Sequence, residues 1–295
     1  MIELRHLRYF IAVAEELNFR RAAERVHIDQ TPLSRTIRDL EERLGVILFV
    51  RRPRRLELTP AGDKLLDHAR RLLMRIERTK RVVRETDARY REPLRIGVDE
   101  STAQPKLAEC LVRWRAISPD VPLEITEMRT AELMTALRSE EVDVGFSFGL
   151  PDDETVVQQP AWVSPAVAIL SPTHELARRE VLSLTELLSF PAIACHAAFH
   201  PGLCRQMNGI LRRYSLSPTP VAEARTLTGY LTRVAIGLGV GVADEDHMRA
   251  LKRTDIVVVR LAEQIHFTTY VLHKHQNFGP QPALQRFITH ATALQ

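Results

Sequence analysis

The hydrophobic pattern of residues 18–62 predicts two short helices joined by a tight turn. Asn18 is suited to cap a helix over Phe19–Val26. Three apolar residues share one face of that helix at helical spacing: Ala22, Ala23 and Val26. Residues 27–32 then predict a turn and a second helix that starts near Gln30, with Asp29 or Thr31 as its cap.

The second helix is expected to end at Gly45 and to bury one stripe of apolar residues. That stripe consists of Leu33, Ile37, Leu40 and Leu44. The opposite face carries Ser34, Arg35 and Arg38, whose side chains suit phosphates and base edges. The following segment, Phe49–Leu58, predicts a basic hairpin. Such a hairpin beside a helix-turn-helix forms a wing, and the second helix then enters the major groove of DNA.

This geometry assigns expected roles to individual side chains. Base contacts are expected from the residues at the N-terminal end of the recognition helix: Gln30, Thr31 and Pro32. Phosphate contacts are expected from Ser34, Arg35, Arg38 and Arg51, whereas Arg52 and Arg54 are expected in or near the flanking minor groove.

After Gly62, neither proline nor glycine occurs until Pro93. An apolar seam with a period of about 3.5 residues runs through this stretch, as in helices that pack against a partner helix. The seam includes Leu65, Ala69, Leu72, Ile76 and Val83. About 30 helical residues span roughly 45 Å, which is too long to be buried against a small winged domain. We therefore predict a dimerisation helix, with packing on the same chain as the alternative.

From Pro93 onward, short apolar runs alternate with helical stretches, which favours an open α/β sheet. The first set of strands and helices is expected at Leu94–Val98, Pro105–Ile117, Leu123–Met128, Ala131–Ser139 and Val142–Phe146. The second set is expected at Ala166–Leu170, Ala192–Cys195, Pro201–Arg213, Val221–Ala224 and Thr226–Ile236. The last elements are expected at Gly237–Val242, Ile256–Leu261, His266–His273 and Pro282–Leu294.

In open α/β sheets, ligands bind at the carboxyl ends of the strands. This rule brings Asp99–Thr102, Arg129, Thr130, Ser147 and Phe148 of the first lobe to the candidate site. The residues expected to bind the effector are Ser101, Thr102, Thr130, Phe148, His196, His200, Gly202 and Leu203. The hydroxyl groups of Ser101 and Thr102, with free amides at a helix start, could hold a carboxylate. Helix capping explains Ser101 and Thr130 equally well, and solvated loop histidines are the simpler interpretation of His196 and His200.

Charge is distributed unevenly along the chain. Residues 1–92 hold 22 Lys and Arg against 15 Asp and Glu, a net charge of +7, whereas the remainder has a net charge of −3. Twenty of those 22 basic residues are Arg, which suits phosphate and guanine contacts. No secretion signal is visible, and no apolar run approaches about 18 residues, so we expect a cytoplasmic protein with no membrane span.

The residues FRRAAERVHIDQTPLSRTIRDLEERLGVILF and RRLELTPAG resemble the N-terminal winged helix of LysR-type transcriptional regulators. The resemblance implies an all-α winged helix-turn-helix at residues 1–60, a linker helix at 61–91 and a periplasmic-binding-protein-like α/β effector domain at 92–295. Lobe I of that domain would comprise about 92–162 and 267–295, and lobe II about 163–266. The resemblance also implies a bacterial homodimer through the linker helix, a homotetramer, promoter DNA and RNA polymerase as partners, and a small-molecule effector between the lobes.

Two positions depart from the family pattern. The family often has Ser where this chain has Asp29, which keeps a capping oxygen but places a carboxylate near the phosphates. Aromatic-acid and muconate-sensing members use positions matching Ser101, Thr130 and the turn at Gly202–Leu203. Some also have Arg at the position of Phe148. A small organic acid, aromatic in some of these members, is the effector that the resemblance implies, but Phe148 in place of the arginine argues against a dicarboxylate. Either His196, His200 or Arg205 supplies the missing cation, or the effector carries less charge.

Thiol-based redox sensing is the alternative within the same family. Cys195 and Cys204 are nine residues apart, as are two cysteines of the peroxide-sensing members. However, the surroundings of Cys204 resemble those of the sensing cysteine, which would place its partner at Arg213. Cys195 ends an apolar strand, where a buried and inert thiol is expected.

An enzyme is not expected, because G-x-S-x-G, P-loop and H-E-x-x-H motifs are absent from the sequence. The three cysteines, with Cys110 as the third, lack metal-ligand spacing. The run Asp244–His247 is interpreted as a solvated, acidic helix start rather than a metal site. No cofactor is expected. A stand-alone solute-binding protein would not explain the basic N-terminal third.

Overall fold

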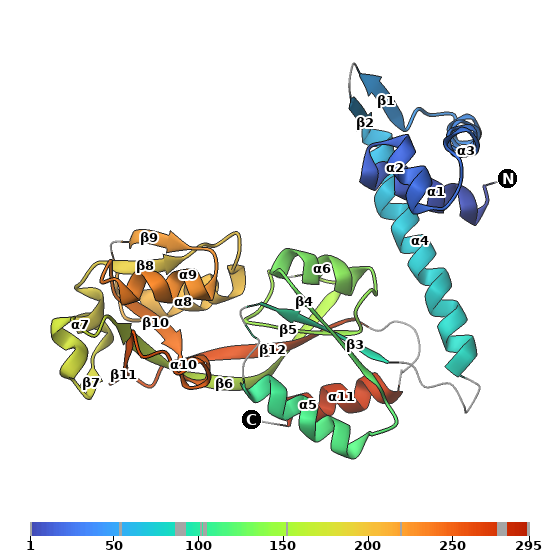
Figure 1. Ribbon diagram of the computed structural model, residues 1–295. Coiled ribbons are helices and arrows are strands. Elements are labelled where there is room, and N and C mark those ends of the chain that lie inside the picture. The colour runs from blue at the N-terminus through green and yellow to red at the C-terminus, as the bar shows by residue number, and fades with distance from the viewer. Residues whose placement is uncertain are drawn as a thin grey trace. The chain divides into compact units, whose positions relative to one another are not determined.

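The computed structural model describes residues 2–52, 55–85, 93–100, 102, 105–151, 153–218, 220–275 and 282–293. The chain forms two compact units, residues 1–90 and residues 91–295, and each is described by itself. Figure 1 labels their helices and strands. In the described part of the chain, no helix is both long and apolar enough to cross a membrane.

Unit 1 is a helix-turn-helix followed by a hairpin and a long helix. Its elements are α1 (Leu4–Glu16), α2 (Phe19–Arg25), α3 (Gln30–Leu44), β1 (Phe49–Arg52), β2 (Arg55–Leu58) and α4 (Pro60–Glu85). The side chain of Asn18 caps α2 by accepting hydrogen bonds from the amides of Arg20 and Arg21. Gly45 ends α3 with a φ of +68°, a left-handed conformation that glycine adopts without strain. The winged helix-turn-helix expectation is thus confirmed, and α1 is an element that the sequence patterns did not predict.

One apolar core holds the three short helices of unit 1 together. The stripe of α3 supplies Leu33, Ile37 and Leu40, all essentially inaccessible to solvent. These residues pack with Phe10 of α1 and with Ala22 of α2. Burying one face of α3 in this way fixes which of its side chains face outward.

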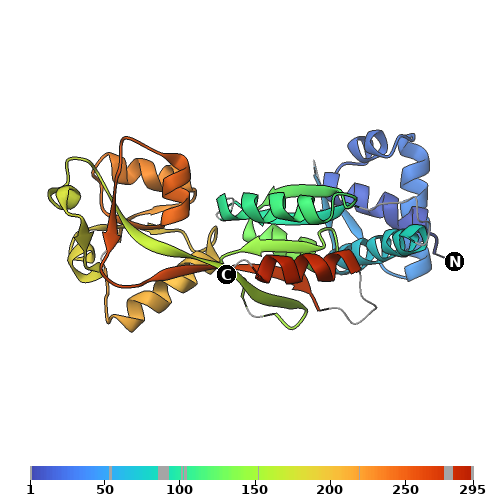
Figure 2. The ribbon, with the colours of Figure 1, turned by 90° about the horizontal axis from the view of Figure 1, so that it is seen from below.

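Unit 2 contains two α/β lobes, which share the long strands β6 (Val156–Leu170) and β12 (His266–Lys274). The other elements of lobe I are β3 (Leu94–Asp99), α5 (Pro105–Ile117), β4 (Leu123–Met128), α6 (Thr130–Arg138), β5 (Val144–Ser147) and α11 (Pro282–Thr292). The strand order is β4-β3-β5-β12-β6, with β3 parallel to β4 and β5. Figure 2 shows α5 and α11 side by side on one face of this sheet, and Figure 1 shows α6 on the other.

Lobe II is built on the second half of β6. Its helices are α7 (Leu184–Leu188), α8 (Pro201–Arg213), α9 (Leu227–Ala235), α10 (Glu245–Leu251) and the 3₁₀ helix η1 (Glu175–Arg178). Its strands are β7 (Val181–Leu182), β8 (Ala192–Cys195), β9 (Pro220–Ala224), β10 (Gly241–Asp244) and β11 (Val257–Leu261). The expected strand Ala166–Leu170 is the end of the longer β6, which pairs with β12 and then with β10 and β11. The strand therefore starts ten residues earlier than the apolar pattern predicted.

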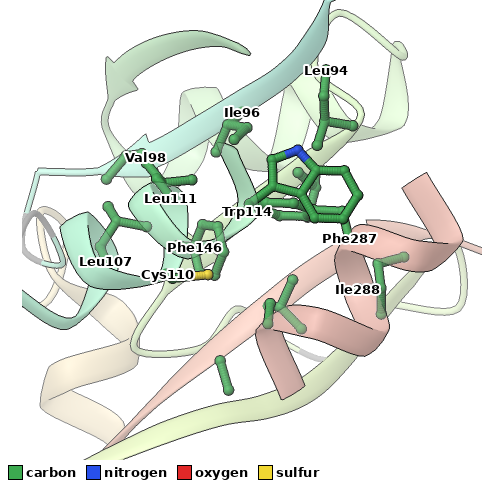
Figure 3. Packing of buried hydrophobic residues seen from close by; sticks show 14 of the residues in the cluster. Leu94, Ile96, Val98, Leu107, Cys110, Leu111, Trp114, Phe146, Phe287 and Ile288 are labelled. Carbon is green, nitrogen blue, oxygen red and sulfur yellow. The ribbon is translucent and has the colours of Figure 1, made fainter. Parts of the chain in front are cut away.

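The core of lobe I lies between the sheet and the pair α5 and α11. Trp114 and Phe287 meet edge to face, with ring centroids 5.1 Å apart, and Phe146 stacks on Trp162 at 5.4 Å. Figure 3 shows that Trp114 of α5 and Phe287 and Ile288 of α11 pack on the same side of the sheet as the apolar residues of β3. Such aromatic packing stabilises lobe I and thereby holds in place the strand ends that carry the candidate ligand residues.

Candidate functional site

The outward face of α3 carries the residues expected to contact DNA. Gln30, Thr31, Pro32, Arg35 and Arg38 are exposed, and Ser34 is half-buried. Asp29 occupies the N-cap position, but its side chain makes no capping hydrogen bond. The expectation that Asp29 supplies a capping oxygen is therefore wrong. Its exposed carboxylate instead lies at the end of the helix that carries the expected base contacts.

One polar contact joins α3 to α1, and no sequence pattern predicted it. His6 of α1 is buried, and its Nε2 lies 2.8 Å from Oδ2 of Asp39 on α3. Arg43, one turn further, contacts the same carboxylate at 2.8 Å. The pKa of Asp39 is lowered by hydrogen bonds from Arg43 and then His6. Asp39 lies 33 residues from His6, so sequence spacing gives no signal for this contact.

The wing is anchored to α3 through Glu41. One carboxylate oxygen of Glu41 accepts hydrogen bonds from the amides of Leu48 at 2.7 Å and Phe49 at 3.2 Å. Strands β1 and β2 then pair in antiparallel register. Arg54 and the side chains of Arg51 and Arg52 lie outside the described part of the chain, so their expected DNA contacts remain predictions.

The apolar seam of α4 divides into two parts. Leu65 is half-buried and Ala69 is 1% exposed, and both pack into the core of their own unit. In contrast, Leu72 is 49% exposed and Val83 is 63% exposed, while Ile76 is half-buried. The first part of the expected dimerisation seam is thus used within the chain, and the second part stays open on the surface of unit 1.

In lobe I, the hydroxyl groups expected to hold an effector bind the protein itself. Thr102 is buried, and its Oγ1 lies 2.8 Å from the carbonyl oxygen of Asp99 and 3.0 Å from that of Phe146. Thr130 donates a hydrogen bond to the buried carboxylate of Asp99. These contacts tie together the carboxyl ends of β3, β4 and β5. Ser101 lies outside the described residues.

Gly202 lies where lobe II meets the segment that leaves β5. A Cβ added to Gly202 would lie 2.2 Å from the carbonyl oxygen of Gly149 and 2.7 Å from the carbonyl carbon of Phe148. Nearby, the side-chain amide of Gln206 donates to the carbonyl oxygens of Phe148 and Thr268, at 2.7 Å each. The start of α8 is therefore packed directly on the backbone that links the lobes, and only glycine fits at position 202.

A cluster of cations gathers around Phe199, in the loop before α8. The guanidinium of Arg129, from lobe I, lies 5.5 Å from the ring centroid, and that of Arg225, from lobe II, lies at 5.3 Å. His196 contacts the same ring edge-on at 5.2 Å. Neither arginine forms an ion pair with any described residue. The strand ends placed Arg129 near the site but gave no signal for Arg225, so the positive charge was expected from His196, His200 or Arg205.

The two histidines of this loop are less solvated than expected. His200 is buried, and its Nε2 donates to the carbonyl oxygen of Arg225 at 2.8 Å, whereas His196 is half-buried. Arg205, another expected cation, donates to the carbonyl oxygen of Leu150 at 2.5 Å. The interpretation of His200 as a solvated histidine is therefore wrong, since it anchors the backbone beside Arg225.

Three of the expected effector residues line a cavity inside lobe II instead of joining Thr102 and Thr130. Phe148, His200 and Leu203 border this space of about 350 Å³, together with Cys195 and Cys204. The Asp244–His247 run also reaches the cavity. Asp244 caps α10 and contacts His247 Nδ1 at 2.5 Å, so the run is a helix start as expected. The side chains of Asp244 and His247 are buried, however, so the expectation that this helix start is solvated is wrong for these two residues.

The sulfur atoms of Cys195 and Cys204 lie 3.0 Å apart. The hydrogen bond between the two thiols raises the pKa of Cys195, to which burial adds, and lowers the pKa of Cys204. Cys195 is half-buried rather than enclosed. The described residues include no group of three or more His, Cys, Asp and Glu side chains that could hold a metal ion.

Comparisons with known proteins cover both units. The lysR-family model of bacterial regulatory helix-turn-helix proteins matches residues 4–63, and the LysR substrate binding domain model matches residues 87–295. The regulator CatR of Pseudomonas putida is 33% identical to this chain, and the match covers 98% of each protein. The uncharacterised regulator YnfL of Escherichia coli is 32% identical, and the match covers 98% of this chain and 97% of YnfL. The crystal structure of full-length CbnR with its target DNA superposes with a TM-score of 0.81 at 23% identity, covering 100% of both chains.

Proposed function

The chain belongs to the LysR-type family of DNA-binding transcriptional regulators, and we propose that a small organic acid bound between its two effector lobes controls how it binds promoter DNA. The DNA-binding and effector-binding domains follow from family membership, and the relatives compared above are regulators rather than enzymes. The nature of the effector and the residues that bind it are the proposal.

The pair Arg129 and Arg225 carries the effector proposal. These guanidinium groups come from opposite lobes, flank one aromatic ring, and form no ion pair with a described residue. A carboxylate placed between them would gain charge-assisted hydrogen bonds from both lobes. The chain has Phe148 where some aromatic-acid sensors of the family have an arginine, and these two arginines would supply the missing positive charge.

Control by the effector would follow from a shift in population between conformations. An anion that contacts both Arg129 and Arg225 binds more tightly when the lobes bring these side chains together. It can shift the equilibrium only by the difference between its affinities for the two conformations. In a tetramer, this change would alter the spacing of the winged domains and thus the bend of the promoter DNA.

We propose that the protein recognises its promoter as a dimer, which provides two recognition helices. We propose that the exposed part of α4, with Leu72 and Val83, pairs with α4 of a second copy, because exposed apolar residues at this spacing gain from burial against a partner. The dimer would then recognise two half-sites related by a two-fold axis. RNA polymerase would be a further contact at the promoter.

The DNA part is tested by fluorescence anisotropy of the full chain on its own upstream intergenic DNA and on a scrambled sequence, across a salt series. We expect selective binding with a steep dependence on salt concentration. Equal and weak binding to both sequences would overturn the proposal for promoter recognition.

The effector part is tested by screening small mono- and dicarboxylates for a thermal shift and a change in promoter affinity. Arg129→Ala and Arg225→Ala should each lower the affinity for an active acid by about tenfold or more, because each variant loses one charge-assisted contact. Arg249→Ala, at an exposed position of α10, is the matched control and should leave the response unchanged. An acid that acts equally on all three variants would contradict the proposed site.

Redox sensing is a second candidate function, favoured by the 3.0 Å separation of the Cys195 and Cys204 sulfur atoms. The Cys204 thiolate would attack a hydroperoxide, the O–O bond would break, and the alcohol or water would leave after protonation. The resulting sulfenic acid on Cys204 would then react with the Cys195 thiol, forming a disulfide and releasing water. The two cysteines together lose two electrons, which the hydroperoxide accepts.

Mass spectrometry without reducing agent tests this candidate after treatment with a stoichiometric hydroperoxide. A loss of two hydrogen atoms is expected in the wild-type chain and in Cys110→Ser, but not in Cys195→Ser. Burial raises the pKa of Cys110 to about 12, which makes that thiol a suitable unreactive reference. Persistence of free thiols at positions 195 and 204 would rule redox sensing out.

A further inference from the structure

The cavity inside lobe II is large enough to hold a small molecule. Its volume is about 350 Å³, within the range of small-ligand pockets. Residues of β8, β9 and β10 line one side, and residues of α8, including Leu203, Met207 and Leu211, line another. Exposed residues such as Ala197 and Asn208 also border it, so the cavity opens to the surface of lobe II.

The charges around this cavity differ in sign from those at the Arg129 and Arg225 pair. Of the described residues that line it, none is Arg or Lys, and the acidic ones are Glu223 and Asp244. Most of the other lining side chains are apolar. A carboxylate or sulfonate entering the cavity would lose its hydration and meet acidic groups instead of a cation, so an anion is disfavoured there.

One histidine supplies a hydrogen-bond acceptor to the lining. Nε2 of His200 carries the proton donated to the carbonyl oxygen of Arg225, which leaves Nδ1 as an acceptor. That Nδ1 is buried and has no hydrogen-bond partner among the described residues. His247 also lines the cavity, and its Nδ1 contacts the carboxylate of Asp244. A buried acceptor without a partner is a place where a donor group of a ligand would bind favourably.

We propose that lobe II binds a second small molecule in this cavity: a neutral, largely apolar compound that carries a hydroxyl or N–H donor. The apolar part lies against α8 and β8–β10, and the donor group meets Nδ1 of His200. The site goes beyond the proposed effector site, since neither Arg129 nor Arg225 lines it. One side of the site is formed by α8. The first turn of this helix packs on the backbone of Phe148 and Gly149, which links the lobes.

The helix α8 both lines the cavity and contacts the two segments that link the lobes, so a ligand in the cavity can affect how the lobes are arranged. Cys204, Leu203 and Met207 of α8 line the cavity, while Gln206 of the same helix holds Phe148 and Thr268 through three hydrogen bonds. A molecule that fills the space behind α8 therefore supports the helix that contacts both linking segments. We expect such a ligand to raise the thermal stability of the full chain.

Two fluorescent probes that differ by one sulfonate test the proposal. N-phenyl-1-naphthylamine is neutral and has one N–H donor, and 1-anilinonaphthalene-8-sulfonate is the same molecule with an anionic group. The full chain should bind the neutral probe saturably and at least about tenfold more tightly than the sulfonate, a difference of about 1.4 kcal/mol. Equal binding of the two probes, or no saturable binding of the neutral one, would overturn the proposal.

Neighbouring alanines at the cavity mouth provide matched variants. Ala197 lines the cavity and Ala198 does not, and both are exposed, so a tryptophan at either position is compatible with folding. Ala197→Trp should lower the affinity for the neutral probe by about tenfold or more, whereas Ala198→Trp should bind the probe with wild-type affinity. Met207→Trp, which fills the cavity from α8, should have the same effect as Ala197→Trp. Unchanged binding in Ala197→Trp would show that the probe sits elsewhere and would reject the site.

The same variants separate this inference from the proposed effector function. Ala197→Trp should leave the response to an active organic acid intact, and Arg129→Ala should leave binding of the neutral probe intact. If both variants abolished both responses, a single site would explain the data and the inference of a second one would fail.

Discussion

The imidazole of His6 and the carboxylate of Asp39 lie 2.8 Å apart, and this contact joins the first helix to the helix that carries the expected base-contacting residues. The amide of Glu3 donates to Nδ1 of His6, which places the ring proton on Nε2, facing Asp39. Asp39 also pairs with Arg43. The orientation of α3 therefore depends on a part-buried polar contact as well as on its apolar stripe.

Replacing His6 with alanine should loosen unit 1. His6→Ala leaves a cavity and removes a partner of Asp39, and we expect a loss of about 1–3 kcal/mol in the free energy of unfolding. Urea denaturation measures this, and promoter affinity should fall in parallel. Arg5→Ala, at an exposed position of the same helix, should change stability by no more than about 0.5 kcal/mol. Equal effects of both variants would argue against the role of the His6 contact.

Substitutions on α3 should separate phosphate contacts from base contacts. Arg35→Ala should weaken binding to all DNA sequences and lower the salt slope by about one, while Arg35→Lys should keep the slope. Gln30→Ala should instead relax the preference at one base pair by about 1–3 kcal/mol. Anisotropy with single-base variants of the operator distinguishes the two. Wild-type binding by both alanine variants would refute this docking of α3.

Two glycines of α8 should respond oppositely to alanine. Gly202→Ala would place a Cβ 2.2 Å from the carbonyl oxygen of Gly149, so we expect a loss of about 1–3 kcal/mol in stability. Gly209 has nothing within 4 Å of an added Cβ, and Gly209→Ala should stabilise the helix by about 0.5–1 kcal/mol. Thermal denaturation of the two variants provides the comparison. A stable Gly202→Ala variant would mean that α8 does not pack on the linking backbone.

The acid stability of unit 2 should depend on Asp153. Hydrogen bonds from Thr155 and then Arg138 lower the pKa of Asp153 to about 2. Because this value is below that of an unfolded aspartate, near 3.9, the contribution is complete above about pH 4 and is lost as the pH falls towards 2. Asp153→Asn should cost about 1 kcal/mol at pH 7 and flatten the acid dependence, whereas Glu180→Gln should do neither. Parallel pH curves for Asp153→Asn and the wild type would exclude this role.

The open part of α4 should control assembly. Replacing Leu72 and Val83 together with glutamate places charges in the proposed helix pair, so the mass in solution should fall to half that of the wild type or less. Lys64→Glu, an exposed position of the same helix, should keep the wild-type mass. Light scattering after gel filtration gives both values. An unchanged mass of the double variant would locate the assembly contacts elsewhere.

The sequence by itself determined the helix-turn-helix and hairpin of unit 1 and the class of the protein, although not α1. Cap, apolar stripe and stop residue act within a few positions of each other, so Asn18, Leu33 and Gly45 predicted two helices with nearly their observed bounds. The same applies to α5, β8 and α8, whose predicted ends agree with the structure. The family pattern lies mainly in this locally encoded part.

Only the tertiary structure decided which polar groups meet. His6 and Asp39, Arg129 and Arg225, and the sulfur atoms of Cys195 and Cys204 converge because strand order and helix packing bring distant segments together. Thr102 and Thr130 looked like ligand groups in sequence but bind neighbouring strand ends. Local periodicity specifies which face of an element is buried, whereas the partner across that face depends on the packing of the whole chain.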